Sequence, residues 1–414
     1  MISFILPTRN NLPYVKTAIS SIRRFYLDAE IVLLDDSSTD GTDEWVAQTY
    51  DPYLTYYKHE GKQIGHTVLY DIGVRMCKHD IFSIFHADMV CGPKYIENLL
   101  KHLKPGMVVS ATRIEPPLHP PGKEKIVMDF GLYADGFKTE EFLSYCLKAQ
   151  EELSNRDVVT KGIFAPWAMF KADFIKMGGH DAYFSPFPYE DSDIFQRFIL
   201  NGYEIKQSRD AFAYHFTCRG HRWTEQIQKD DYFYKLCCAK NQAHFIRKWG
   251  SWIKNDEYSY PKISPLYDIG FIVKNCSHEI LGLIEPWCST IYNDCPNIEG
   301  FIQRVQPGTP FDLTKRIKNI EDEKTNQILI SFDGHTLNQT SFHFLTQLPD
   351  VLKDSGEIGN MQFDIFDFEI KGLETFESNL IQNDNEWHTK RLVTPSESDK
   401  LCTDELFKVF QCTK

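Results

Sequence analysis

The chain has 414 residues, of which 42% are hydrophobic and 14% are aromatic, so it can bury the cores of two domains. Its net charge of −13 argues against binding to nucleic acid and against attraction to anionic membranes. No apolar run approaches the roughly 18 residues of a membrane span, and the first residues lack the basic region of a signal peptide. The 11 cysteines form no CxxC pair, so we expect reduced thiols, no zinc site and a cytoplasmic location.

Strands and helices alternate in the first part of the chain. Short apolar runs at Ile2–Leu6, Ile31–Leu34 and Ile81–Phe85 predict buried strands. Between them, apolar side chains recur at helical spacing: Val15, Ala18, Ile19 and Ile22, then Trp45 and Val46, then Ile64, Val68, Ile72 and Met76. This alternation predicts a mostly parallel sheet with right-handed crossovers.

Each of these strands is followed by a polar stretch, at Pro7–Asn10, Asp35–Ser38 and His86–Asp88. The carboxyl ends of parallel strands share one edge of a sheet, and open α/β sheets bind ligands there. We therefore expect the three stretches to line one site. Asp88 offers a hard oxygen ligand for a divalent cation that also grips phosphates. Taken by itself, Asp88 has an alternative interpretation as a loop aspartate that caps the next helix.

The segment 161–223 contains further candidate site residues. An apolar stretch surrounds Trp167, and Tyr189–Asp193 places several acids at the start of a helix, where the helix dipole favours them. A later strand reaches His215, and a helical stretch runs through Tyr232–Trp249. Asn, Asp, Ser and two prolines then cluster at Asn255–Pro265, so we predict one domain over residues 1–262 and a second over 263–414.

The second part of the chain again alternates between apolar runs and helical patterns. Strands are predicted at Ile269–Val273, Ser289–Tyr292, Gln327–Ser331 and Met361–Phe368, and helices at Ser277–Ile284 and Ser341–Leu352. The pattern indicates a second, smaller α/β domain. Nothing in this region indicates its role.

Motifs in the first 250 residues resemble, in the same order, those of family 2 glycosyltransferases, enzymes of the GT-A fold. LLDDSSTDGT at Leu33–Thr42 is close to the family's DDxSxDGT loop and is the most specific match. His86-Ala87-Asp88 falls at the DxD motif with histidine in place of the first aspartate, and Tyr189–Asp193 with Arg197 resembles the yEDxDLxxR block. Weaker matches are Gly65–Gly73, Met177–Asp181 and Lys248–Gly250. The resemblance implies a Rossmann-like, mixed but mostly parallel α/β sheet with helices on both faces.

The resemblance also implies an inverting transferase of the hexosyltransferase class. Such an enzyme moves a sugar from a nucleotide sugar, with UDP as the favoured nucleotide, to a hydroxyl of a glycan or other acceptor. Asp36 would accept a hydrogen bond from a ring N–H of uracil, and Asp35 would brace the loop. The residues expected to contact the two sugars or the nucleotide are Pro7, Thr8, Asn10, Asp35, Asp36, His86, Ala87, Asp88, Trp167, Arg219 and Arg222. His86 is expected to donate to the ribose.

By the same resemblance, Asp88 would bind a divalent cation, Mn²⁺ or Mg²⁺, that bridges the diphosphate. We expect His215 to be a second protein ligand, with His221 as the runner-up. A histidine packed by Phe216 and Trp223 is the structural alternative. Arg219 and Arg222 would grip the diphosphate, because guanidinium groups suit phosphate, and a solvated basic turn is the alternative for them.

On the acceptor side, Asp191 is the expected general base. Inverting transfer needs one carboxylate near the acceptor hydroxyl to take its proton. Glu190 is expected to bind acceptor hydroxyls, and Trp167 to stack on the acceptor sugar, with a core tryptophan as the alternative. Helix capping is the alternative for these acids, and we assign Asp193 to it.

Two other function classes remain open from the sequence. A nucleotidyltransferase shares the general sheet and an acid-held metal, but it usually carries a glycine-rich basic loop after the first strand, and Thr8–Pro13 contains no glycine. A non-catalytic module that binds sugar or nucleotide is the other class. The presence of both Asp88 and Asp191 argues against it.

Overall fold

The computed structural model describes residues 1–154, 159–217 and 232–376. Within these ranges the chain forms two compact units, one from residues 1–217 with 255–261 and the other from 232–254 with 262–376. Each unit has its own hydrophobic core. Helix α8 (Tyr232–Trp249) belongs to the second unit, whereas the sequence-based boundary placed it in the first. None of the described helices is long and apolar enough to span a membrane.

The first unit is built on one mixed sheet, in which the described strands follow the order β3-β2-β1-β4-β9-β6-β10-β5. Strands β7 and β8 add to β6 and β10. The strand bounds are β1 Ser3–Thr8, β2 Glu30–Asp36, β3 Leu54–His59, β4 Ile81–Ile84, β5 Met89–Cys91, β6 Met107–Glu115, β7 Lys125–Val127, β8 Val159–Thr160, β9 Trp167–Phe170 and β10 Glu204–His215. Strands β3, β2, β1 and β4 run parallel to one another, as do β6 and β10, whereas β9 is antiparallel to β4 and β6, and β5 is antiparallel to β10. The predicted mixed, mostly parallel sheet is confirmed.

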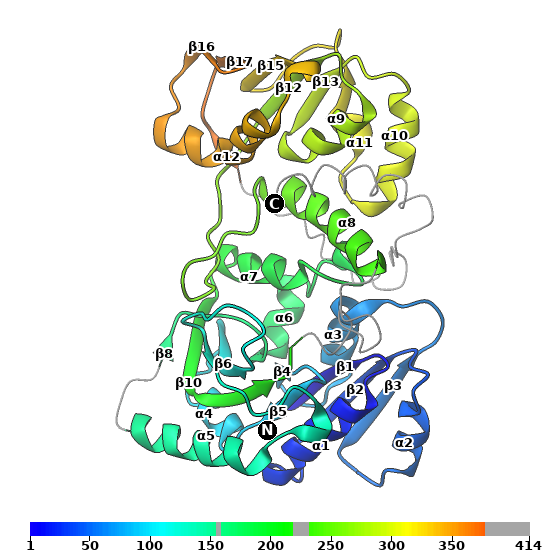
Figure 1. The fold of residues 1–414 in the computed structure, drawn as a ribbon, viewed down its shortest axis with the longest axis vertical. Coiled ribbons are helices and arrows are strands. Elements are labelled where there is room, and N and C mark those ends of the chain that lie inside the picture. Colours follow the sequence, from blue (N-terminus) through cyan, green and yellow to red (C-terminus); the bar gives the residue numbers. More distant parts are fainter. Residues whose placement is uncertain (155–158, 218–231, 377–414) are drawn as a thin grey trace. The chain divides into compact units, whose positions relative to one another are not determined.

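Helices lie on both sides of this sheet (Figure 1). Their bounds are α1 Leu12–Phe25, α2 Thr42–Gln48, α3 Gly65–Met76, α4 Tyr95–Leu100, α5 Thr139–Leu153, α6 Lys171–Met177 and α7 Glu190–Leu200. In Figure 1, helices α1, α4 and α5 lie below the sheet, and α3, α6 and α7 lie above it. Because β2 is covered on both faces, every one of its residues is buried, as in other parallel strands between helical layers.

Helix α3 approaches the sheet closely at Gly73. A Cβ atom at this position would lie 2.5 Å from a side-chain carbon of Leu34 and 2.6 Å from one of Ile5. A larger residue would push the helix away from β1 and β2, so glycine is required for this packing. The approach matters for the site, because α3 begins directly beside the loop that follows β2.

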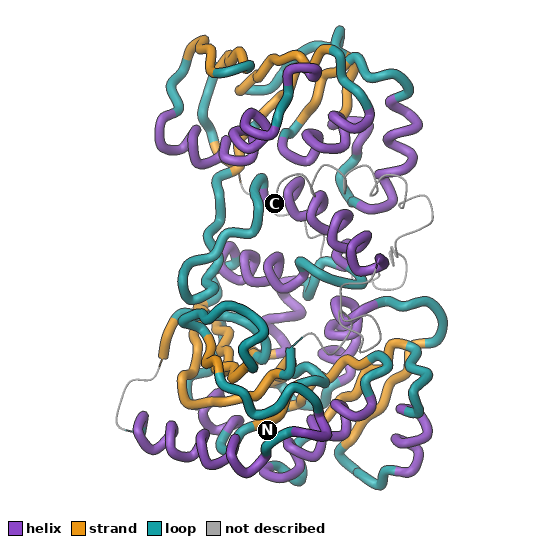
Figure 2. The backbone as a smooth tube through the Cα atoms, in the orientation of Figure 1, coloured by secondary structure: helices purple, strands orange, loops and turns teal. Residues whose placement is uncertain are grey.

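The second unit contains a separate sheet of order β14-β13-β12-β15-β17-β16, whose first four strands are parallel and whose last two are antiparallel. The strands are β12 Ile269–Lys274, β13 Thr290–Asn293, β14 Ile317–Asn319, β15 Ile328–Asp333, β16 Gly359–Phe363 and β17 Phe366–Ile370, with a separate pair of β11 Leu266–Tyr267 and β18 Thr375–Phe376. Figure 2 shows these strands together with helices α9 His278–Ile284, α10 Ile298–Val305, α11 Leu313–Arg316 and α12 Gln339–Ser355. A second, smaller α/β domain is therefore confirmed.

Two elements differ from the sequence-based prediction. The single strand predicted at Met361–Phe368 is the hairpin of β16 and β17, because residues 364 and 365 turn the chain between them. The loop predicted between Asp88 and the next helix contains strand β5, which pairs antiparallel with the end of β10. Strand β5 is only three residues long, too short for a pattern of alternating side chains to reveal it.

Candidate functional site

The carboxyl ends of β1, β2 and β4 lie at one edge of the first sheet. Thr8 is the register partner of Asp35 on β2. On the other side of β1, Ile5 pairs with Ile84, and the Phe85 amide donates to the Ile5 carbonyl at 3.0 Å. The polar stretches that follow these strands therefore share an edge, as predicted.

The two adjacent aspartates at the end of β2 have different partners. Asp35 accepts from the Ser38 amide at 2.8 Å and from the Tyr56 hydroxyl at 2.7 Å, so it braces the loop. Asp36 accepts from the amides of Ile64 and Gly65 at 3.0 and 2.8 Å and holds the start of α3 against the loop. Burial raises the pKa of Asp36, and the two amides oppose that shift. A carboxylate has about four acceptor positions, so binding of a nucleobase N–H by Asp36 stays a prediction.

The loop after β1 is tied to the loop after β2. Asn10 has a positive φ of 49°, its side-chain oxygen accepts from the Thr39 amide at 2.7 Å, and its own amide donates to the Ser38 hydroxyl at 2.9 Å. Arg9 donates to the Asp36 carbonyl. Next to this link, the Thr8 hydroxyl is buried and has no hydrogen-bond partner among the described residues. A bound ligand would supply the partner that this buried hydroxyl needs.

His86, Asp88 and His215 form a group suited to a metal ion. One ligand atom from each lies within 4.8 Å of the others. The Nε2 atom of His215 is 3.5 Å from an Asp88 oxygen, and the rings of His86 and His215 are 5.6 Å apart between centroids. One carboxylate and two imidazoles form a mixed donor set, which suits Mn²⁺ and similar transition metals better than Mg²⁺, an ion that prefers oxygen ligands.

Strand register explains why these side chains meet. His215, the last residue of β10, is opposite Met89 on β5, and the Phe216 amide donates to the Asp88 carbonyl at 3.0 Å. His86, predicted to donate to the ribose, lies with Asp88 and His215 in the group that could hold a metal ion, and its contact with a ribose stays a prediction. The grouping of Asp88 and His215 agrees with the arrangement expected for two metal ligands.

Glu115 is a site residue that the sequence analysis missed. Its Oε1 lies 3.0 Å from Nδ1 of His215, and its Oε2 accepts from Lys125 at 2.9 Å. Burial lowers the pKa of His215, but the carboxylates of Asp88 and Glu115 outweigh burial and raise the pKa to about 9. Burial likewise raises the pKa of Glu115, and its cationic neighbours, Arg113 foremost, bring it well below its usual range.

The acids at the start of α7 have three different environments. Glu190 is only 5% exposed and lies 2.5 Å from Nε2 of His66. Burial lowers the pKa of His66, and Glu190 more than reverses this effect. Glu190 therefore faces a histidine of α3. It does not face the solvent, from which an acceptor hydroxyl would approach. The prediction that Glu190 binds the acceptor does not fit this placement.

Asp191 is half-buried, and no hydrogen bond links its carboxylate to another described residue. Burial, followed by the charge of Glu190, raises the pKa of Asp191 to about 6, against the opposing effects of His66, His180 and Arg113. An acid that is unpaired and has a pKa near neutrality is suited to proton transfer.

Asp193, which the sequence analysis assigned to helix capping, follows the N-cap residue Tyr189, whose own side chain forms no cap hydrogen bond. It is fully buried and lies 3.6 Å from Arg197. Arg197 also donates to the carbonyls of Met177 and Gly179 at 2.8 and 2.5 Å. These contacts fix the turn after α6 to the helix that carries Asp191.

Trp167 lies in the core, whereas it was predicted to stack on the acceptor sugar. Its side chain is 0% exposed and packs edge-on against Phe82 and Phe198, so it is a core residue and cannot stack on a sugar. Ala168 and Met169 of β9 are equally buried, which is why an apolar run alone could not distinguish the two roles. The predicted phosphate ligands Arg219 and Arg222, and the alternative metal ligand His221, lie outside the described residues.

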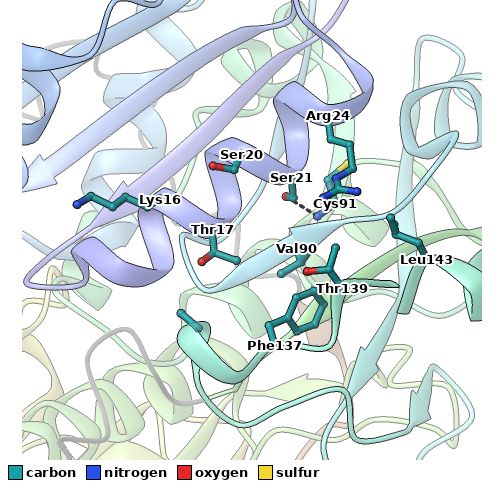
Figure 3. Close-up of a pocket in the computed structure, with 11 residues that line it drawn as sticks. Lys16, Thr17, Ser20, Ser21, Arg24, Val90, Cys91, Phe137, Thr139 and Leu143 are labelled. Carbon is teal, nitrogen blue, oxygen red and sulfur yellow. Dashed lines mark hydrogen bonds between the residues drawn. The ribbon is translucent and has the colours of Figure 1, made fainter. Parts of the chain in front are cut away.

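A separate cavity of about 270 Å³ lies between α1, β5 and the start of α5 (Figure 3). Lys16, Thr17 and Arg24 line it from α1, and Phe137 and Thr139 line its other side. One wall is fixed by the Ser21 hydroxyl, which accepts from the Cys91 amide at 2.8 Å. None of the predicted site residues lines this cavity, so it is distinct from the edge of the sheet described above.

Two curated bacterial proteins are similar to part of the chain. An uncharacterized glycosyltransferase of Rickettsia felis is 32% identical over 100 residues, which make up 24% of this chain and 16% of that protein. An uncharacterized glycosyltransferase of Rickettsia typhi is 30% identical over 104 residues, or 25% of this chain and 32% of that protein. The chain therefore spans less than a third of the length of either relative.

Solved structures are similar to a larger share of the chain at lower identity. GalNAc-T7 with UDP, GalNAc and Mn²⁺ has 12% identity and a TM-score of 0.39, and the match covers 52% of this chain and 43% of that one. The mannosyltransferase PcManGT of Pyrobaculum calidifontis, with GDP-Man and Mn²⁺, has 18% identity and a TM-score of 0.39, with coverage of 58% and 61%.

A family model matches the region that contains the ends of β1, β2 and β4. The model described as Glycosyl transferase family 2 matches residues 3–146. The match includes the ends of β1, β2 and β4 together with Asp88 and Glu115, and it ends before Asp191 and His215. Residues 3–146 of this chain are a glycosyl transferase family 2 domain.

Proposed function

We propose that this protein is a metal-dependent, inverting glycosyltransferase that moves a hexose from a nucleotide sugar, with a UDP-sugar as the favoured donor, to a hydroxyl of a glycan or other acceptor. The observation that carries the proposal is the group of His86, Asp88 and His215 within a unit whose residues 3–146 are a glycosyl transferase family 2 domain. Mn²⁺ is the ion that we expect, since two of the three candidate ligands are imidazoles.

Different parts of the nucleotide sugar would bind at different strand ends along this edge of the sheet. The nucleoside would lie against the loops after β1 and β2, where the Thr8 hydroxyl lacks a partner among the described residues and Asp36 is buried. The diphosphate would lie at Asp88, on the far side of β1. A divalent cation held there would neutralise the charge that develops on the departing nucleotide.

Asp191 would act as the general base on the acceptor side. Its carboxylate is not engaged by another described residue, and its pKa of about 6 leaves it ionised at neutral pH but still basic enough to take a proton. Direct attack of the acceptor oxygen on the sugar carbon would invert that carbon. Glu190, paired with His66, would contribute by holding the start of α7.

The proposal predicts metal-dependent nucleotide binding. In calorimetric titrations with UDP and GDP, Mn²⁺ should strengthen binding in the wild type, and Asp88→Asn should abolish that gain. Removal of an outer-shell partner of a bound metal typically weakens metal binding about 10- to 100-fold. The loss of metal-dependent affinity in Asp88→Asn should be at least as large. Asp80→Asn is the matched control, because Asp80 is exposed and precedes the amino end of β4, the strand that leads toward Asp88. Equal binding with and without Mn²⁺ in the wild type would remove the metal from the proposal.

The pH dependence of transfer tests the role of Asp191. A base must be unprotonated to act, and the pKa of Asp191 is about 6. We therefore expect kcat for sugar transfer to be constant above about pH 7 and to fall tenfold per pH unit below about pH 6. Initial rates at saturating donor and acceptor, between pH 5 and pH 8, would measure this. A rate that stays constant down to pH 5 would exclude Asp191 as the base.

A further inference from the structure

We propose that Glu115 is the positioning residue of the metal site: it holds the His215 ring so that Nε2 faces Asp88 and His86. The inference rests on the proposed function, since it assumes that a metal binds at this group. Metal-bound histidines in proteins are usually held through their second ring nitrogen by a carboxylate or a carbonyl, which fixes the tautomer and the ring orientation.

The sheet brings Glu115 and His215 together. They are the last residues of β6 and β10, two parallel neighbours in which Ala213 pairs with Arg113 and Tyr214 with Ile114. The next step of this register places Glu115 beside His215, with Oε1 at 3.0 Å from Nδ1. With Nδ1 donating to the carboxylate, the proton that a metal displaces from the ring is the one on Nε2, so the lone pair for the metal is on the atom that lies 3.5 Å from Asp88.

Glu115 cannot easily turn away from the histidine. It is 2% exposed, its second oxygen accepts from Lys125 at 2.9 Å, and Arg113 lies 3.4 Å from its first oxygen. The guanidinium of Arg113 is in turn held 3.7 Å from the centre of the Phe164 ring. The orientation of His215 is therefore set by a carboxylate that two cations hold in place.

Glu124 provides a matched control in the same cluster. It is also buried and lies 3.3 Å from Arg113, but no contact joins it to His215. If only the balance of charge around Arg113 mattered, loss of Glu124 and loss of Glu115 would have the same effect on metal binding. If orientation of the histidine matters, only loss of Glu115 will weaken it.

The test is Mn²⁺ binding to the full chain, measured by the free Mn²⁺ signal in electron paramagnetic resonance, with and without UDP. We expect Glu115→Ala to weaken binding about 10- to 100-fold, Glu115→Gln to recover part of the loss because its amide oxygen still accepts from Nδ1, and Glu124→Ala to bind as the wild type does. Thermal melting would check that each variant is folded.

A double-mutant cycle separates positioning from a general structural role. If Glu115 acts through His215, adding Glu115→Ala to His215→Ala should cause no further loss of Mn²⁺ binding. An equal loss in both backgrounds, an equal loss from Glu124→Ala, or no Mn²⁺ binding by the wild type would overturn the inference. If Mn²⁺ binds and depends on Glu115 while no sugar is transferred, the inference stands and the proposed function fails.

Discussion

Replacing Asp191 by asparagine is expected to lower kcat for sugar transfer by about 10²- to 10⁴-fold, the usual contribution of a positioned general base. Asparagine keeps the size of the side chain but cannot take a proton from the acceptor. Donor affinity should hardly change, because this residue acts on the acceptor side. Transfer kinetics and nucleotide titrations on the same variant would show the two effects separately.

The same substitution distinguishes a base from a helix cap. Asparagine caps a helix about as well as aspartate, so a structural role for Asp191 predicts a nearly silent change. Asp193→Asn is the matched comparison two residues along the helix. It should weaken the buried contact with Arg197 and act on the melting temperature instead of kcat. Transfer at the wild-type rate by Asp191→Asn would refute its assignment as the base.

A large loss of stability in the second unit is expected from Glu285→Ala. Glu285 is fully buried and accepts from Arg247 Nε at 2.8 Å and from Arg316 Nε at 2.7 Å. Burial raises the pKa of Glu285, and the two arginines more than offset it. Removing the carboxylate leaves two largely buried guanidinium groups without their shared anion, and breaking such an arrangement costs about 3–5 kcal/mol.

Chemical denaturation would measure this loss. Trp287 and Trp252 are 4.9 Å apart between ring centroids at the core of the second unit, so unfolding of this unit changes their contribution to the tryptophan fluorescence. Glu279→Ala on the exposed face of α9 is the control, and it should change the free energy of unfolding by less than about 0.5 kcal/mol. A similar free energy of unfolding for both variants would show that the buried acid contributes little.

The features that the sequence predicts correctly depend on neighbours in the chain. Asp35 and Asp36 directly follow a run of buried residues, so their place at the end of β2 can be inferred from a short segment. The alternation of strands with helices then indicates that the ends of β1, β2 and β4 share one edge. The apolar run around Trp167 has no such context, because a buried strand and an exposed stacking surface can have the same composition.

The features that the sequence analysis missed depend on contacts between distant residues. Glu115 and His215 are 100 residues apart, and Glu190 and His66 are 124 apart. Glu115 is the last residue of β6, which begins at Met107. A charged residue at the end of a strand has no apolar period to mark it, and only the register with β10 shows that it faces a histidine.

An irregularity in β10 makes the site sensitive to chain length. Gln207 lies opposite Ser110 and Phe212 opposite Thr112, so the four residues 208–211 of β10 face a single residue of β6. This segment is held to α4 by two hydrogen bonds: the Asn98 side-chain amide donates to the Asp210 carbonyl at 2.8 Å, and the Asn98 carbonyl accepts from the Ser208 hydroxyl at 3.0 Å. Successive side chains of a strand point to opposite faces. Deleting one of these four residues is therefore expected to turn His215 away from Asp88 without altering any site residue, so the site depends on the length of this segment more than on its composition.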